Sequence, residues 1–404
     1  MASSAEAEAK TQGSIGEVFA AFLKLGLTSF GGPIAHLGYF RDELVVRRRW
    51  IDEAGYGDLV ALCQFLPGPA SSQVGFALGL LRAGLLGALA AWTAFTLPSA
   101  ALMIGFAYGA GFLTGPIGVA LVHGLKLVAV AVVAQAVLGM VRSLTPDGTR
   151  AAIALGALTL VTLAGGAAGQ LGAIALGALA GLWICRTGPL APVAHVGFKA
   201  SRRVAGICLV LFFVLLVALP ALHAATDAQS VALFDAFYRS GALVFGGGHV
   251  VLPLLQAEVV PPGWIADNAF LAGYGAAQAV PGPLFTFAAY LGAAVRPEPN
   301  GIAGGVLALV AVFLPGLLIL LAALPFWEAL RARPAAQAAL RGSNAAVVGI
   351  LGAALYDPVW TSAVLNPRDF LIAGAGFVAL VGWKCPPWLV VIGMVTGAVC
   401  LSFA

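Results

Sequence analysis

Long apolar stretches, interrupted by short polar loops, run through almost the whole of this 404-residue chain. Hydrophobic residues make up 61% of the sequence and charged residues 9%, whereas soluble domains average about 45–50% and about 25%. A soluble protein with so few charges could not cover its surface. The apolar runs also lack the period-2 alternation of a transmembrane barrel. The sequence therefore predicts an all-α polytopic membrane protein.

An internal duplication divides the chain. Residues 26–69 and 241–283 carry the same motifs in the same order, a Phe-Gly-Gly, a Trp and a Gln-x-x-Pro-Gly-Pro. Further matched pairs are Glu43/Glu258, Trp50/Trp264, Gln64/Gln278, Pro98/Pro315 and Gly124/Gly342. We therefore expect four parts: a polar tail at 1–16, a first repeat at 17–186, a basic loop and linking helix at 187–230, and a second repeat at 231–404.

Positive charges indicate that the two repeats have opposite orientations. The loop after the first segment of the first repeat is basic, whereas the matching loop at 254–266 has no Lys or Arg. The reverse holds one hairpin further on, because 113–118 has none and 327–341 is basic. By the positive-inside rule the repeats face opposite ways, and the odd linking span at 204–222 would invert the second one. The basic residues are Arg41, Arg47, Arg48 and Arg49 in one loop, and Arg331, Arg333 and Arg341 in the other.

A membrane topology follows if the broken segments of each repeat enter and return on one side. The N-terminus would then lie inside and the C-terminus outside, without a cleaved signal peptide. Several runs are shorter than the ~20 residues that a span needs, and the count rises to about thirteen if the broken segments cross. The full spans are expected at 84–113, 118–141, 151–165, 168–185, 204–222, 301–326, 340–356, 369–383 and 387–403.

The two Pro-Gly-Pro motifs should break helices at membrane depth, since proline removes a backbone donor. Such a break survives only inside protein or beside water. The helix that restarts after it offers free N–H groups and a partial positive charge, which suit an anion. A packing kink is the alternative. The candidate ligands are Gly68, Ser71, Ser72 and Gln73 in the first repeat, and Gln278, Gly282 and Thr286 in the second.

The duplicated Phe-Gly-Gly turns form a second pair of candidate elements, because glycine allows close backbone approach. A histidine follows each turn, and it could relay protons or, once protonated, help to bind an anion. A satisfied structural histidine is the alternative in each case. The candidate residues are Gly31, Gly32 and His36, with Gly246, Gly247 and His249.

Lys126 lies near the centre of an apolar span, with His123 one turn earlier. A cation at that depth costs about 3 kcal/mol and usually faces a cavity. Its counterpart Asn344 is neutral, so the first repeat would supply the charge of the site. Arg82 would line a cytoplasmic entrance or act as a positive-inside anchor.

Carboxylates are few, and three are candidates for proton coupling together with His36 and His249. Glu43 and Glu258 occupy matched positions, and Asp58 begins the second segment. Glu43 lies among arginines, so a simple ion pair is the alternative. Residues 38–52 read as an interfacial helix against lipid headgroups, with Trp50 as its anchor.

Several other functions are excluded or disfavoured. No Walker A, G-x-G-x-x-G or H-E-x-x-H motif is present, so neither an ATPase nor another enzyme is indicated, and no cofactor is expected. The net charge of +4 is a topology signal, not a nucleic-acid footprint. The cysteines lack C-x-x-C spacing, so we expect neither disulfides nor a metal site; they are Cys63, Cys185, Cys208, Cys385 and Cys400.

In these motifs the sequence resembles the chromate ion transporters, in their long two-domain form. The resemblance rests on SFGGPIAH at 29–36, YFRDELVVRRRW at 39–50, QFLPGPASSQ at 64–73, FGGGHVVLPLL at 245–255 and AQAVPGP at 277–283. It implies chromate efflux from the cytoplasm of a bacterium across its inner membrane, coupled to the membrane potential or proton gradient. It also implies that sulfate, a similar tetrahedral dianion, competes or is itself carried.

The residues and the resemblance together predict alternating access around a dianion site near the midplane. A passive anion channel and a membrane enzyme acting on lipid are the alternatives. Anion flux that does not depend on a proton gradient would favour the channel. The small number of Asp and Glu residues argues against the enzyme. The sequence is compatible with a homodimer but decides neither the oligomeric state nor the physiological anion.

Overall fold

The computed structural model describes residues 13–30, 32–110, 115–164, 166–186, 201–244, 248–327 and 333–402, and these are helical without strands. Five described helices are apolar and long enough to cross a membrane, judged by length and composition. This confirms the predicted all-α membrane class. They are α5 (Ala70–Ala110), α6 (Gly115–Leu144), α9 (Arg202–Ala225), α14 (Gly301–Ala323) and α16 (Pro334–Ala354), the last continued by the π-helix η5 (Leu355–Trp360) and the short α17 (Thr361–Ala363).

Four further helices coincide with the shorter predicted spans. They are α7 (Gly148–Ala164), α8 (Gly166–Ile184), α18 (Pro367–Val381) and α19 (Pro387–Ser402). The side chain of Asn366 caps α18 by accepting from the backbone amides of its first turn, and Pro367 starts it. Within the described residues, every predicted span thus falls on a helix.

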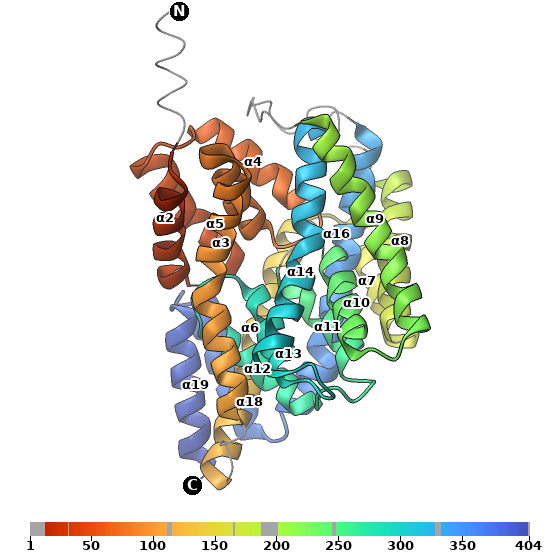
Figure 1. The fold of residues 1–404 in the computed structure, drawn as a ribbon. Helices are drawn as coiled ribbons and strands as arrows, with labels where there is room; N and C mark the ends of the chain where they lie inside the picture. The colour runs from red at the N-terminus through yellow and green to blue at the C-terminus, as the bar shows by residue number, and fades with distance from the viewer. Residues whose placement is uncertain are drawn as a thin grey trace, which may run out of the picture.

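Short helices precede the long ones in each repeat. The first repeat has α2 (Ile15–Thr28), α3 (Gly32–Phe40), the π-helix η1 (Arg41–Arg47) and α4 (Glu53–Phe65). The second has α10 (Gln229–Ala242), η2 (Gly248–Val250), α11 (Val251–Val259), α12 (Asp267–Ala277), η3 (Leu284–Thr286) and α13 (Phe287–Ala294). Figure 1 shows the first set towards one end of the molecule and the second set towards the other, as opposite orientations require.

Helices stop on both sides of the two Pro-Gly-Pro motifs. In the first repeat α4 ends at Phe65 and α5 begins at Ala70, and in the second α12 ends at Ala277 and η3 begins at Leu284. Entry and return on one side of a membrane stays a prediction.

The helix α5 consists of two parts, joined by a sharp bend at Ala83–Gly84. Gly84 has a φ of 64°, and Gly301, at the equivalent position of the second repeat, has a φ of 56°. Both values lie in the left-handed region that glycine adopts without strain. The helix from Ala70 therefore reverses direction here, before the part of α5 that matches the predicted span.

The repeats interlock, because each gives a long helix to the other. In the first repeat α6 packs against α18, α19 and α12 of the second, while α16 of the second packs against α7 and α8 of the first. Gly124 of α6 meets Val395 and Ala398, and its equivalent Gly342 of α16 meets Gly177 and Gly181. Backbones approach this closely only where side chains are missing. Neither repeat therefore packs as a self-contained unit.

Candidate functional site

Two equivalent hydrogen bonds join the broken segments of one repeat to the glycine turn of the other. The amide of Gly68 donates to the carbonyl of Val244 at 2.7 Å, and the amide of Gly282 donates to the carbonyl of Ser29 at 2.8 Å. Val244 and Ser29 each precede a Phe-Gly-Gly turn. The φ values of the two glycines, 117° and 99°, suit no other residue without strain. Segments 176 and 253 residues apart in sequence (244 − 68 and 282 − 29) thus meet by the same contact.

Each break also lies against the proline-containing stretch of the other repeat's long helix. Gly68 faces Gly316 of α14, next to Pro315, and Gly282 faces Ser99 of α5, next to Pro98. The amide of Gln73 donates to the carbonyls of Pro67 at 2.9 Å and of Gly316 at 2.8 Å. The predicted ligand Gln73 therefore holds the first break closed against α14.

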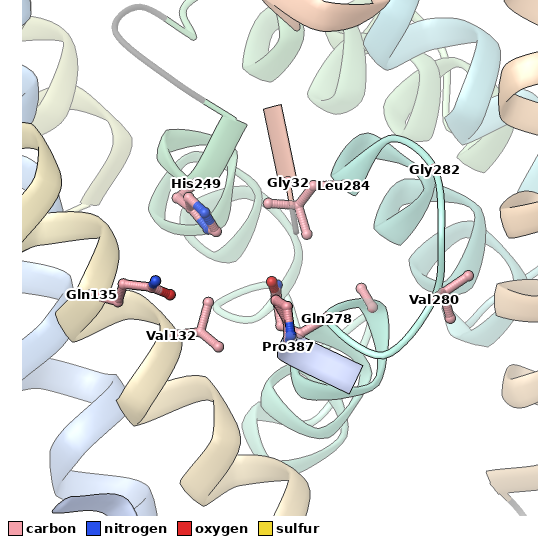
Figure 2. A pocket seen from close by; sticks show the side chains of 10 residues that line it. Gly32, Val132, Gln135, His249, Gln278, Val280, Gly282, Leu284 and Pro387 are labelled. Carbon is pink, nitrogen blue, oxygen red and sulfur yellow. The ribbon is translucent and has the colours of Figure 1, made fainter. Parts of the chain in front are cut away.

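A small pocket of about 40 Å³ opens where these elements cross (Figure 2). That volume corresponds to roughly three water-sized spheres. Residues of both repeats contribute to it, and the prediction named four of them. They are Gly32, Val132 and Gln135 from the first repeat and His249, Ala277, Gln278, Val280, Gly282, Leu284 and Pro387 from the second.

The polar groups around this pocket are neutral donors. The Nδ1 atom of His249 shares a hydrogen bond of 2.6 Å with the hydroxyl of Tyr274, and the ring lies at the edge of the pocket. If the Tyr274 hydroxyl donates to Nδ1, Nε2 carries a proton that can be donated into the pocket. Gln135 and Gln278 add two side-chain amides. In that tautomer of His249, three N–H donors surround a small cavity and suit the oxygens of an anion.

A second group of polar side chains is buried at the start of α5. His36 Nδ1 lies 3.4 Å from the Ser71 hydroxyl, and the His36 ring packs edge-on against Phe95. Within the described residues, His36 Nε2 and the hydroxyls of Ser72, Ser29 and Thr96 are buried without a hydrogen-bond partner. A buried polar atom left in that state costs about 1–3 kcal/mol. Each of these atoms therefore has an unused hydrogen-bonding capacity that water or a polar ligand could satisfy.

Lys126 is 7% exposed and bonds to two neutral oxygens, the Asn268 side chain at 3.0 Å and the Ser362 carbonyl at 2.9 Å. It forms no ion pair within the described part of the chain. One turn earlier, His123 lies 2.8 Å from a carboxylate oxygen of Asp369. Nine residues of helix, about 14 Å, separate Lys126 from Gln135. The structure therefore places this cation along α6 from the pocket but not in its lining.

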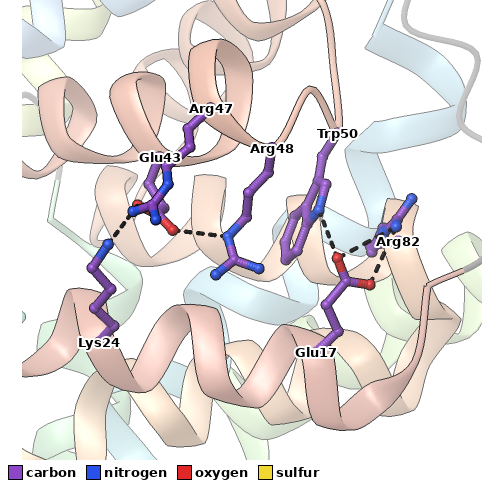
Figure 3. A network of polar contacts seen from close by, with 7 residues as sticks. All are labelled: Glu17, Lys24, Glu43, Arg47, Arg48, Trp50 and Arg82. Atoms are coloured by element: carbon purple, nitrogen blue, oxygen red, sulfur yellow. Dashed lines mark hydrogen bonds and ion pairs between the residues drawn. The ribbon is translucent and has the colours of Figure 1, made fainter.

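Two predicted residues, Arg82 and Glu43, lie in a charged network between α2, η1 and the first part of α5 (Figure 3). Arg82 pairs with Glu17 at 3.2 Å and lies over the ring of Trp50 at 5.5 Å. Trp50 donates from its indole nitrogen to Glu17, so its polar edge is engaged within the protein. Residues 38–52, expected to form an interfacial helix, are α-helical to Phe40 and π-helical from Arg41 to Arg47, and the remaining five residues are not helical.

Glu43 accepts from three cations in this network (Figure 3), Lys24 at 2.7 Å, Arg48 at 2.8 Å and Arg47 at 3.2 Å. Burial alone would raise the pKa of this carboxyl, but the hydrogen bonds from Lys24 and Arg48 outweigh it and lower the pKa to about 2. A group that holds its charge so firmly is poorly suited to carry protons.

The other predicted residues lie apart from the pocket. Asp58 accepts from the indole of Trp327 at 3.2 Å, Thr286 donates to the carbonyl of Pro283, and Glu258 pairs with Arg239. Asn344 is partly buried on α16. Gly31, Gly246 and Gly247 lie outside the described residues.

Sequence reasoning missed Gln135, Tyr274 and Pro387. Gln135 had a signal, because it is the one amide side chain in the apolar run 118–141. Tyr274 and Pro387 had none, since their place at the site depends on how the repeats cross.

A family model described as Chromate transporter matches this chain twice, over residues 16–182 and 231–399. The chain is 29% identical over 407 residues to the chromate transport protein of Pseudomonas aeruginosa, a match covering 94% of this chain and 90% of that protein. It is 29% identical over 396 residues to the probable chromate transport protein of Synechococcus elongatus, with 94% and 93% covered. It is 28% identical over 380 residues to the chromate transport protein of Cupriavidus metallidurans, with 89% and 84% covered. No solved structure matches significantly.

Proposed function

This chain belongs to the chromate transporter family, and we propose that it exports chromate from the cytoplasm across the inner membrane of a bacterium. Curated relatives that match nearly the whole chain are named chromate transport proteins. The sequence has no Walker A motif, so the membrane potential or the proton gradient would supply the energy.

One observation carries the proposal: the pocket lies between the Pro-Gly-Pro break of the second repeat and Gly32 and α6 of the first, so each repeat lines part of it. A change in how the repeats sit against each other must therefore alter access to the pocket. The equivalent bonds from Gly68 to Val244 and from Gly282 to Ser29 give the two repeats matching hinges. This is the geometry that alternating access requires of inverted repeats.

The pocket would bind a tetrahedral dianion through Gln135, Gln278 and His249. Hydrogen bonds from neutral donors to an anion are stronger than those between neutral groups. Lys126 would add a positive charge further along α6, where the anion could bind a second time on its path. The same donors would accept sulfate, whose oxygens have the same arrangement, so sulfate or another oxyanion is the alternative substrate.

The test is radioactive chromate uptake into inverted membrane vesicles energised with NADH, with and without an uncoupler and with sulfate as competitor. We expect uptake that collapses with the uncoupler. Uptake that ignores the uncoupler would indicate a passive channel instead. No uptake by vesicles that contain the protein would overturn chromate as the substrate.

A pair of variants tests the position of the site. Gln135→Ala removes one donor to a charged ligand, worth about 1.5–3 kcal/mol, so the KM for chromate should rise about 10- to 100-fold. Gln337→Ala removes the same amide from the first turn of α16, where it bonds Arg341, and should leave KM unchanged. Equal KM values for Gln135→Ala and the wild type would place the anion elsewhere.

A further inference from the structure

Two equivalent ion pairs fasten the short helices of each repeat. Lys24 pairs with Glu43 at 2.7 Å and joins α2 to η1, and Arg239 pairs with Glu258 at 3.0 Å and joins α10 to α11. Glu43 and Glu258 are matched positions of the duplication. The two pairs lie in the two sets of short helices that Figure 1 shows towards opposite ends of the molecule.

The charge around these two pairs is opposite. Glu43 has three cationic partners, so that cluster has an excess of positive charge. Arg239 instead forms ion pairs with two carboxylates, that of Glu258 and, at 3.1 Å, that of Asp235. With both carboxylates ionised, the second cluster has one negative charge too many. One proton would balance it.

A cavity of about 480 Å³ leads to the second cluster. It is lined by Glu258 and Arg239, by His223 in the last turn of the linking helix α9, by Asp227 just after that helix, and by Trp264. The Glu258 side chain is 16% exposed, whereas that of Asp235 is 2% exposed. The side-chain nitrogen of Gln229, also on the lining, is buried without a hydrogen-bond partner among the described atoms. A water-accessible route thus reaches Glu258 before Asp235.

The titratable groups that face Glu258 come from α10, from the end of α9 and from the stretch just after α9. They are Asp235 and Arg239 of α10, His223 near the end of α9, which lies 3.6 Å from Asp235, and Asp227 just after it. The other packed helices add little: α8 and α14 carry no titratable side chain in their described lengths. On α12, Asp267 bonds to Gln256, and on α16, Arg341 bonds to Gln337 and the Cys185 carbonyl.

We propose that Glu258 is the site at which an external proton binds to drive anion export, with Asp235, Arg239 and His223 setting its charge; this rests on the proposed function. A hydrated proton from the outer side forms an O–H bond on the Glu258 carboxylate, and the trio of Glu258, Asp235 and Arg239 changes from one excess negative charge to neutral. Arg239 keeps its charge and its bond to Asp235. The same proton leaves to the cytoplasm when the carboxylate is exposed on that side.

Two further observations support this assignment. Burial raises the pKa of Glu258 above its ordinary value, opposed by the charge of Arg239 and aided by that of Asp235. The helix that carries Glu258 also leads to the pocket, because α11 continues from η2, which contains His249. Nine residues, about 14 Å of helix, separate the two side chains. Loss of the charged bond between Glu258 and Arg239 would loosen α11 from α10 and move His249.

The test uses purified full-length protein in liposomes, with the potential clamped and a pH gradient as the only driving force. In Glu258→Gln we expect gradient-driven chromate uptake to fall about 5- to 100-fold, the usual range of coupling between two sites. Chromate-for-chromate exchange, which needs no proton, should stay near the wild-type rate. Glu43→Gln, at the matched position, should keep gradient-driven uptake when normalised to folded protein.

The outcomes separate this inference from the proposed function. A wild type that neither takes up nor exchanges chromate overturns the proposed function itself. A wild type that transports chromate without regard to the pH gradient, or a Glu258→Gln variant that keeps the gradient dependence, overturns the proton site alone. If Glu258→Gln does not fold, Glu258→Asp keeps a carboxylate and should retain coupling, whereas Glu258→Ala in the same assay should not.

Discussion

The backbone amide of Gly282 donates a hydrogen bond of 2.8 Å to the carbonyl of Ser29, across the boundary between the two repeats. Gly68 makes the equivalent bond to Val244. Both amides are therefore occupied in holding the repeats together and are not free to bind an anion. The anion donors expected at the two breaks must come from side chains beside them, and Gln135, Gln278 and His249 supply these in the pocket that Gly282 lines.

Substituting Gly282 by alanine should damage this junction. The φ of 99° costs a non-glycine residue about 1–3 kcal/mol, and a Cβ there would lie 2.8 Å from the Ser99 hydroxyl. We expect a lower melting temperature in detergent and loss of chromate uptake. Gly57→Ala is the control, because Gly57 is helical with open space around it. Gly282→Ala as stable as Gly57→Ala would contradict the role of this turn.

Adding Ser99→Ala to the Gly282→Ala variant separates the two causes. The second substitution removes the clashing oxygen but not the backbone strain, so melting temperature should recover only in part. Full recovery would show that the clash alone matters, and no recovery would assign the whole loss to backbone strain.

The stability of the charged network around Glu43 should depend on pH. Its pKa is lowered to about 2, so the stabilisation is fully present above the unfolded value near 4.5 and is lost as the pH falls towards 2. At pH 7, Glu43→Gln should lower the unfolding free energy by on the order of 1–3 kcal/mol. Thermal unfolding of the wild type and Glu43→Gln between pH 7 and pH 3 should show that their difference in melting temperature becomes smaller below about pH 4.5.

The exposed pair of Arg41 and Glu53 serves as the comparison for that series. These side chains are 48% and 61% exposed, and such pairs contribute little. Glu53→Gln should leave the melting temperature nearly unchanged at every pH. A Glu43→Gln gap that stays constant down to pH 3 would mean that the lowered pKa is not what stabilises the network.

Helix positions were predictable because apolar runs and their polar boundaries are local properties. Within the described residues each predicted span lies on a helix, and both Pro-Gly-Pro motifs interrupt helices, since two prolines around a glycine remove backbone donors and leave a flexible residue between them. A single proline did not have this effect, because Pro98 and Pro315 lie inside α5 and α14. The π-helix at Arg41–Arg47 was not predictable in this way. It is held by contacts to α2 such as Lys24 with Glu43, which no local pattern specifies.

The candidate site was only half predictable, because it depends on contacts between distant segments. The duplication singled out Gly32, His249, Gln278 and Gly282, and these meet in one pocket. Nothing local indicates that each break contacts the other repeat's glycine turn. Arg82 illustrates the reverse case: its place at a helix end suggested an entrance, whereas its partner Glu17 lies 65 residues earlier.

Close packing of α16 on α8 should be sensitive to one added methyl group. A Cβ on Gly342 would meet the carbonyl oxygen of Gly177 and lie 2.7 Å from the Cα of Gly181. Overpacking of this kind costs about 1–3 kcal/mol, so Gly342→Ala should melt earlier than the wild type. Gly352→Ala on the same helix has no neighbour closer than 3.5 Å and should be neutral or slightly stabilising. Similar melting temperatures for the two variants would disprove the tight interface.

Replacing Lys126 by methionine should separate stability from transport. The cation is buried and held by the neutral oxygens of Asn268 and Ser362. Within the described chain no ion pair offsets the free-energy cost of its desolvation. Removing the cation relieves a desolvation penalty of several kcal/mol but also loses two hydrogen bonds, and these two effects offset each other. The melting temperature should therefore stay level or rise. Chromate uptake should fall about 10- to 100-fold, the loss of one charged contact to an anion.

Lys384→Met is the matched control, because it removes the same charge from an exposed turn and should change neither property. Lys126→Arg keeps the charge and should recover part of the uptake that Lys126→Met loses. If Lys126→Met transports chromate at the rate of Lys384→Met, the cation serves the packing of α6 against α12 and takes no part in the anion's path. If Lys126→Met lowers both the melting temperature and chromate uptake, Lys126 would likewise have a structural role.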